Sequence, residues 1–381
     1  MTDDDLHRHL IDQPASRDGL NTPVLLIDRG ALDRNIAAMA RFVAARGLQL
    51  RPHAKTHKSH DIARRQIDAG AVGICCAKLG EAEAMADNGV TEGILLTSPV
   101  VTPQAIARLM ALNCRTTDLI CVVDNPENVR ELGKAAHEAG KPLRVIIDID
   151  PGIHRTGVAT PDTAVALLDA IGSEHDLHYA GVQFYCGAQQ HIPSFDKRRN
   201  AMETLRLRLQ AFINALTEAG GGPGIVTGGG TGTHRIDPDL GLFTELQAGS
   251  YVFMDAEYAA CDLCGDGFPA LFETALLVDA RVVSANTPGL VTLDAGLKAF
   301  SSDAGVPTVV KGAPAGATYR FMGDEHGALL LPNGGTLPLG HVVTLATPHC
   351  DPTVNLHDTY HVIEGETLRA LWPVTARGRS R

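Results

Sequence analysis

From about residue 20 to residue 255 the chain alternates short apolar runs with amphipathic stretches. The stretches repeat apolar residues at helical spacing, as in the series Leu32, Ile36, Met39 and Val43. This alternation is typical of a parallel sheet whose strands are joined by helical crossovers. The predicted strands cover residues 24–27, 48–52, 72–76, 93–97, 119–123, 143–149, 179–185, 224–227 and 246–253.

The turns between these runs support the same interpretation. Thr102-Pro103, Asn125-Pro126 and Thr160-Pro161 each place a capping side chain before a proline at the first helical position. If the run at 24–27 is set aside, eight strands remain, which predicts a TIM-type (β/α)8 barrel. An open, doubly wound sheet is the structural alternative.

After about residue 260, short strands and turn residues replace the long helices. Strands are expected at 274–278, 290–294, 341–346 and around Val362, which predicts an antiparallel β-domain. The expected organisation is an N-terminal segment, 1–28, whose strand pairs with the β-domain, then a barrel over 29–258 and the C-terminal β-domain over 259–381.

Charge and composition exclude several classes of protein. Lys plus Arg number 33 against 44 Asp plus Glu, a formal net charge of −11, which argues against nucleic-acid and anionic-membrane partners. No apolar run approaches the roughly 20 residues of a membrane span, and the acidic N-terminus does not resemble a signal peptide. The eight scattered cysteines suggest reduced thiols, so a cytoplasmic protein is expected.

A basic segment, Arg51 to Lys58, follows the first predicted barrel strand. Side chains at the carboxyl ends of barrel strands face the active site, and a lysine there can become a nucleophile for a carbonyl group. An ordinary basic surface loop is the alternative interpretation of Lys55.

Two glycine-containing loops follow the seventh and eighth barrel strands, at Thr227–Thr233 and Gly249–Tyr251. Glycines let backbone N–H groups approach an anion, and these two loops are the usual phosphate site of such barrels. Each loop alone is as easily a tight turn. Together they predict a phosphate-binding site.

Three further side chains are expected at the same end of the barrel. Arg155 could hold an acidic ligand atom, Tyr185 adds an aromatic ring, and His191 could act as an acid or base. A salt bridge for Arg155 and a structural role for His191 are the alternatives. A strand-end lysine, a phosphate site and an arginine together fit pyridoxal 5′-phosphate.

In the β-domain, His349 and Asp351 follow a predicted strand. On an extended segment, residues two apart face the same side, so the two side chains converge while Cys350 points away. An imidazole and a carboxylate suit a divalent ion such as Mn²⁺, Mg²⁺ or Zn²⁺. A plain His–Asp hydrogen bond is the alternative, and the pair Cys261 and Cys264 is interpreted as non-metal.

The chain resembles the D-threonine aldolases, which are alanine-racemase-like, fold type III enzymes. It is similar also to 3-hydroxy-D-aspartate aldolase and to the D-serine and hydroxyaspartate dehydratases. The resemblance runs through nearly the whole chain. Its motifs include Arg51–Lys55, Thr227–Gly232, Thr244–Tyr251, Asp294–Lys298, Asp324–Gly327, His349–Thr353 and Thr375–Gly378.

The resemblance implies a role for each candidate residue. Lys55 would carry the cofactor through its aldehyde, Arg155 would contact the pyridine nitrogen, and His191 would take a proton from the substrate hydroxyl. His349 and Asp351 would bind the metal, with Mn²⁺ favoured, and a homodimer is implied. The remaining cofactor contacts would come from Tyr185, Thr227, Gly229, Gly230, Thr231, Ser250 and Tyr251.

The activity implied is cleavage of a D-3-hydroxy-amino acid to glycine and an aldehyde. The main alternative is elimination to a 2-oxo acid and ammonia; the resemblance associates that reaction with a His-x-Cys pair, whereas this chain has Asp351. A racemase would not need a metal holding a hydroxyl. A non-catalytic pyridoxal-phosphate carrier would resemble the barrel alone.

Overall fold

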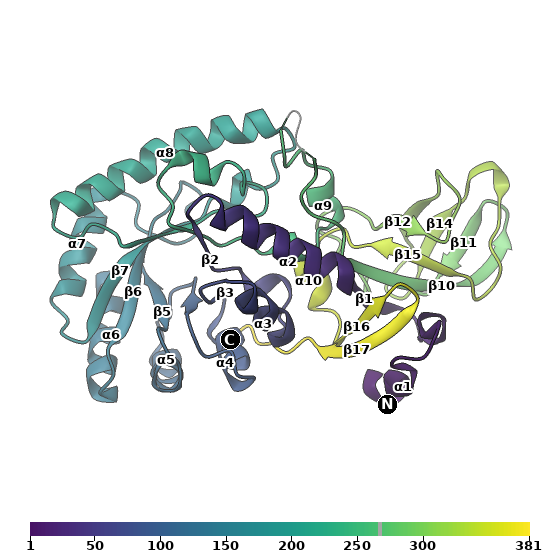
Figure 1. The fold of residues 1–381 in the computed structure, drawn as a ribbon, viewed down its shortest axis with the longest axis horizontal. Helices are drawn as coiled ribbons and strands as arrows, with labels where there is room; N and C mark the ends of the chain where they lie inside the picture. The colour runs from purple at the N-terminus through teal and green to yellow at the C-terminus, as the bar shows by residue number, and fades with distance from the viewer. Residues whose placement is uncertain (266–268) are drawn as a thin grey trace.

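The computed structural model describes residues 1–265 and 269–381 and places two sheets side by side (Figure 1). The first sheet within these residues is eight-stranded and parallel, in the order β2-β9-β8-β7-β6-β5-β4-β3. Its strands are β2 (Gln49–Leu50), β3 (Ile74–Cys76), β4 (Ile94–Leu96), β5 (Ile120–Val123), β6 (Leu143–Asp148), β7 (Leu177–Phe184), β8 (Ile225–Gly228) and β9 (Glu245–Leu246).

Backbone contacts between the segments of β2 and β3 close this sheet into a barrel. The N–H of Val72 donates to the carbonyl of Leu50 at 2.9 Å, and the N–H of Cys75 donates to that of Pro52 at 2.9 Å. A parallel bridge also joins His53 to Cys75. The predicted (β/α)8 barrel is therefore confirmed, and the open doubly wound sheet is excluded.

Helices surround the barrel where the amphipathic stretches predict them. Leu32 and Met39 on the first of them are fully buried, and Thr102 and Thr160 each cap a helix by accepting a backbone N–H. The helices are α2 (Arg29–Ala44), α3 (His60–Asp68), α4 (Leu79–Asp87), α5 (Pro103–Arg115), α6 (Pro126–Ala139), α7 (Pro161–Gly172) and α8 (Phe195–Glu218). A short 3-10 helix, Asp237–Leu240, lies between β8 and β9.

The last barrel strand is much shorter than the predicted strand 246–253. Strand β9 ends at Leu246, and Ser250–Val252 forms a 3-10 turn. The chain leaves the sheet here because it passes tightly beneath the loop that carries Lys55: a Cβ on Gly249 would lie 2.7 Å from the Thr56 hydroxyl. The prediction of a long eighth strand is wrong, and the turn brings Ser250 to the end of the barrel.

The second sheet within the described residues is nine-stranded and mixed. Most pairs are antiparallel, but β1 lies between β10 and β16 and is parallel to β16, so an entirely antiparallel domain is not what forms. The strands are β1 (Val24–Asp28), β10 (Leu276–Thr287), β11 (Leu290–Leu293), β12 (Thr308–Lys311), β13 (Thr318–Phe321), β14 (Gly327–Leu330), β15 (Val342–Ala346), β16 (Thr359–Glu364) and β17 (Thr367–Pro373).

Short α-helices in the described residues are α1 (Asp3–His7) near the N-terminus, α9 (Ala256–Ala259) between the two sheets and α10 (Cys350–Val354) between β15 and β16. Helix α1 lies beside β16 and β17, whereas the C-terminus returns to the barrel near α4 (Figure 1). The backbone N–H of Ala376 donates to the carbonyl of Lys58 at 2.9 Å. Among residues 1–265 and 269–381, no helix is long and apolar enough to cross a membrane.

Several buried histidines are neutral because burial penalises their charged form. Burial lowers the pKa of His57 and of His361 to about 4, and that of His234 to about 3. The unfolded chain protonates its histidines near their ordinary pKa of 6.5. Between these values the unfolded state binds protons that the folded state does not, so stability is lost as the pH falls.

We therefore expect the free energy of unfolding to fall by about 1–2 kcal/mol for each such histidine as the pH drops from about 7.5 to 5. Urea titrations at several pH values measure this slope. His234→Gln should reduce the slope, whereas the control His175→Gln, at a side chain 95% exposed, should leave it unchanged. A stability that does not vary over this range would contradict the assignment of neutral buried imidazoles.

Candidate active site

Two adjoining cavities lie at the carboxyl ends of the barrel strands. Their volumes are about 180 and 130 Å³, and both have His53, Lys55, Tyr185 and Gln247 in their walls. A larger cavity of about 310 Å³ lies beside Cys261, but the predicted site residues do not line it. The shared walls place Lys55 between the two smaller spaces.

Lys55 projects from a 3-10 turn, Ala54–Thr56, that follows β2. Its Nζ lies 3.0 Å from Oδ2 of Asp351. The Asp351 carboxylate raises the pKa of Lys55 despite the opposing effect of burial. Burial would raise the pKa of Asp351, but Lys55 and His349 hold it well below its usual range. The two side chains therefore form an ion pair inside the site.

The smaller cavity has features that fit a phosphate group. Gly230, Thr231, Gly249 and Ser250 line it, and the Thr231 hydroxyl is buried without a hydrogen-bond partner. A Cβ on Gly230 would overlap the end of the Gln190 side chain, so a larger residue at position 230 would require Gln190 to move. An unpartnered buried hydroxyl is costly unless a ligand accepts its hydrogen bond. These residues fit the phosphate of the expected cofactor.

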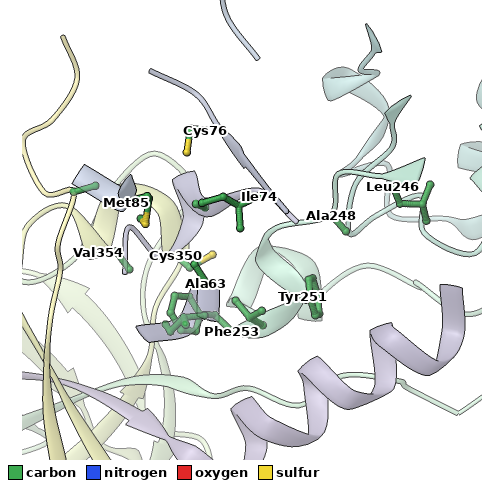
Figure 2. Close-up of a cluster of buried hydrophobic side chains, with 14 of the residues drawn as sticks. Ala63, Ile74, Cys76, Met85, Leu246, Ala248, Tyr251, Phe253, Cys350 and Val354 are labelled. Carbon is green, nitrogen blue, oxygen red and sulfur yellow. The ribbon is translucent and has the colours of Figure 1, made fainter. Parts of the chain in front are cut away.

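Three predicted cofactor contacts are not among the walls of either cavity. The Thr227 hydroxyl accepts a hydrogen bond from Nε2 of Gln247 at 3.1 Å, and the Tyr251 hydroxyl accepts one from Gln66 at 3.0 Å. A Cβ on Gly229 would overlap Asp237. Figure 2 shows Tyr251 within a cluster of buried hydrophobic side chains. Thr227, Gly229 and Tyr251 thus support the loops from behind.

Arg155 and Tyr185 line the 180 Å³ cavity together with Lys55. The guanidinium carbon of Arg155 lies 5.7 Å from the centre of the Tyr185 ring, within cation–π range. This cavity can therefore present a cation and an aromatic face to a planar ring whose phosphate occupies the neighbouring space. The donor set fits pyridoxal 5′-phosphate.

His349 and Asp351 line the 130 Å³ cavity, but not on an extended segment. Cys350–Val354 is the short helix α10, with His349 as its extended N-cap residue, so the predicted local conformation is wrong. Cys350 is fully buried among Phe253 and Val354 (Figure 2). The helix turn nevertheless leaves the imidazole and the carboxylate facing the same space, a pair that fits a divalent cation.

Asp303, which the sequence did not single out, fixes the orientation of His349. Its Oδ2 lies 2.7 Å from Nδ1 of His349, leaving Nε2 for a ligand. The Ser301 hydroxyl and the Thr353 hydroxyl donate to the His349 carbonyl at 3.1 and 2.7 Å. Burial would lower the pKa of His349, but Asp303 and Asp351 raise it. A carboxylate behind a metal-ligating histidine is a common arrangement in metal sites.

His191 lines the same cavity and lies beside two residues of α9. Its Nδ1 is 3.1 Å from Oε1 of Glu257, and its ring centre is 4.4 Å from that of Tyr258. Burial lowers the pKa of His191, which favours the neutral, proton-accepting form. Sequence reasoning missed Glu257 and Tyr258; their position just after the eighth barrel strand was the available signal.

The carboxylate of Asp255 joins this part of the site to the segment that carries His349 and Asp351. Its Oδ1 accepts the N–H of Tyr258 at 3.0 Å, and its Oδ2 accepts the N–H of Cys350 at 2.9 Å. Asp255 is 1% exposed. One buried side chain thereby fixes α9 relative to α10.

A second group of possible ligands, Asp3, His7 and His361, does not line either of these cavities, and its ligand atoms lie within 4.8 Å of one another. Nε2 of His7 accepts the backbone N–H of Asn21 at 3.0 Å, so its proton resides on Nδ1 and bonds Nε2 of His361 at 2.8 Å. A metal on Nδ1 would force that proton onto Nε2, against the Asn21 N–H. As folded, the pair is a hydrogen bond that ties α1 to β16.

Comparison with known proteins agrees with this geometry. The family model "Alanine racemase, N-terminal domain" matches residues 27–257, and "Putative serine dehydratase domain" matches residues 275–363. The chain therefore belongs to the alanine-racemase-like family of barrel enzymes. The expected family and fold are confirmed.

Within this family the chain is similar to aldolases over its whole length. It is 37% identical to 3-hydroxy-D-aspartate aldolase of Paracoccus denitrificans, covering 94% of this chain and 93% of that one. It is 37% identical to D-threonine aldolase of an Arthrobacter species, covering 95% of this chain and 94% of that one. The crystal structure of D-threonine aldolase from Filomicrobium marinum superposes with a TM-score of 0.90 at 38% identity, covering 95% and 97%. D-threo-3-hydroxyaspartate dehydratase of a Delftia species is 30% identical, covering 93% and 97%.

If His349 and Asp351 hold a metal, Asp303→Asn should weaken Mn²⁺ binding by about 10–100-fold, because the amide no longer fixes the imidazole or raises its basicity. Isothermal titration of the purified protein with MnCl₂ measures this affinity. Asp358→Asn removes an equally small carboxylate whose side chain is 76% exposed and should leave the affinity unchanged. Equal weakening in both variants would argue against the proposed role of Asp303.

Proposed function

We propose that this protein is a pyridoxal-phosphate- and divalent-metal-dependent aldolase that cleaves D-3-hydroxy-amino acids of the D-threonine type to glycine and an aldehyde. The observation that carries the proposal is the convergence of Lys55, Thr231, His191 and the pair His349 and Asp351 on adjoining cavities. Full-length similarity to two aldolases supports it.

The barrel residues would bind and orient the cofactor. Lys55 would hold it covalently, Thr231 and Ser250 would donate hydroxyl hydrogen bonds to its phosphate, and Arg155 would face its ring nitrogen. Bound pyridoxal phosphate supplies an electron sink for breaking a bond at Cα. An arginine beside the ring nitrogen keeps that nitrogen unprotonated, which moderates the sink and limits side reactions.

His191, His349 and Asp351 would act on the substrate hydroxyl. Because Nδ1 of His191 faces Glu257, Nε2 is the atom available to take the hydroxyl proton. His349 and Asp351 would supply two ligands to a divalent metal, which lowers the pKa of a bound hydroxyl group. Loss of that proton favours cleavage between Cα and Cβ over loss of hydroxide. We favour Mn²⁺, with Mg²⁺ or Zn²⁺ as alternatives.

The second candidate function is dehydration of D-threo-3-hydroxyaspartate or D-serine to a 2-oxo acid and ammonia. The match of residues 275–363 to a serine dehydratase domain and the similar dehydratase favour it. Against it, residue 351 is an aspartate, and the thiol of Cys350 is fully buried and does not line the cavity. The matched β-domain also speaks against a barrel-only cofactor carrier.

Product analysis tests the proposal. We expect protein supplied with pyridoxal phosphate and Mn²⁺ to convert D-threonine, and separately D-threo-3-hydroxyaspartate, to glycine and an aldehyde, and a chelator to abolish the reaction. Lys55→Ala should lose activity and the covalent cofactor, while the control Lys134→Ala, at an exposed position of α6, should retain both. A 2-oxo acid with ammonia would support the dehydratase instead.

The homodimer implied by the family resemblance remains a prediction. Light scattering on the cofactor-loaded protein should give about twice the chain mass of 40.3 kDa. In fold type III enzymes the β-domain of one subunit completes the site of its neighbour, so dilution to monomer should reduce activity. A fully active monomer would contradict this expectation.

A further inference from the structure

Asp351 offers one carboxylate to two cations. Its Oδ2 already lies 3.0 Å from the Lys55 ammonium, and its side chain is only 15% exposed. His349 lines the same 130 Å³ cavity. A metal bound by His349 and Asp351 would therefore use the carboxylate that already contacts Lys55. Two cations that share one carboxylate repel each other.

Attachment of the cofactor removes one of these competitors. The Lys55 ammonium first releases a proton to solvent, and its nitrogen lone pair then attacks the aldehyde carbon. A carbon–nitrogen double bond replaces the carbon–oxygen double bond, and the aldehyde oxygen leaves as water. The nitrogen is then tied to the cofactor and is no longer a free ammonium bonded to Asp351.

We infer that attachment of pyridoxal phosphate to Lys55 frees Asp351 for the metal, so that cofactor and metal bind with positive linkage. This inference rests on the proposed function, and it adds an energetic coupling between the cofactor site and the metal site. Linkage is reciprocal, so the metal must strengthen cofactor binding by the same factor. Coupling between two sites typically changes affinity by roughly 5–150-fold.

The cofactor also brings its own negative charge, which by itself would attract a metal. These two possible causes of the coupling can be distinguished, because only one of them depends on the amine of Lys55. If release of Asp351 causes the coupling, it disappears when position 55 has no amine. If cofactor charge causes it, the coupling persists whenever the cofactor is bound.

The experiment measures Mn²⁺ affinity by isothermal titration, with free Mn²⁺ followed by electron paramagnetic resonance, on protein without and with saturating pyridoxal phosphate. We expect the cofactor to strengthen Mn²⁺ binding at least tenfold. Cofactor affinity is measured from the absorbance of the lysine-bound cofactor, with and without Mn²⁺. Mn²⁺ should strengthen cofactor binding by the same factor as the cofactor strengthens Mn²⁺ binding. Equal Mn²⁺ affinities in the two states would overturn the inference.

Lys55→Met removes the ammonium while keeping a long apolar side chain. This variant should bind Mn²⁺ without cofactor as tightly as the loaded wild type does, and added cofactor should not improve binding further. Lys134→Met on α6 should behave as wild type. Weak Mn²⁺ binding by Lys55→Met, or coupling that persists in it, would overturn the inference.

Failure of the proposed function gives a different result. If His349→Ala leaves Mn²⁺ affinity unchanged, or the wild type forms no covalent adduct with the cofactor, the proposed site and the linkage both fall. If both ligands bind at the proposed residues but independently, only the linkage falls.

Discussion

The two domains meet at a buried carboxylate, and the site exists in this form because of it. Asp255 accepts one N–H from α9 and one from α10, elements that belong to opposite sides of the domain junction. Leaving either buried N–H without a partner would cost about 1–3 kcal/mol. Because α9 lies beside His191 and α10 carries Asp351, this constraint sets how the proposed proton acceptor and the proposed metal ligand face each other.

A buried ion pair between Arg51 and Glu245 stabilises the barrel close to Lys55. Arg51 lies on the segment just after β2, and its guanidinium makes two hydrogen bonds, of 2.9 and 3.0 Å, to the Glu245 carboxylate on β9. Both side chains are almost fully buried. Charge-assisted, two-point hydrogen bonds are directional. They fix the start of the loop that presents Lys55 relative to the turn that presents Ser250, even though β2 and β9 are only two residues long.

Positively charged, negatively charged and neutral side chains lie next to one another in the site. Lys55 and Arg155 provide positive charge toward the 180 Å³ cavity, while Asp351, which lines the 130 Å³ cavity together with His349, provides negative charge there. Partial burial lowers the pKa of His191, which favours its neutral form, and its Nδ1 lies 3.1 Å from Oε1 of Glu257. Such an arrangement keeps one group charged and its neighbour neutral at the same pH, as acid–base and metal-assisted chemistry both require.

The sequence by itself determined the barrel, because strand and helix periodicities and proline caps are local signals. It also predicted Lys55, Arg155, Tyr185, Gly230, Thr231 and Ser250 near one end, since the carboxyl ends of parallel strands share an edge. Tertiary structure alone decided that Thr227, Gly229 and Tyr251 lie behind the cavity walls, that residues 350–354 are helical, and that Asp255, Glu257, Tyr258 and Asp303 support the site. Those outcomes depend on which side chains meet between separate segments of the folded chain, within the barrel as well as between the domains, and no local pattern in the sequence records that.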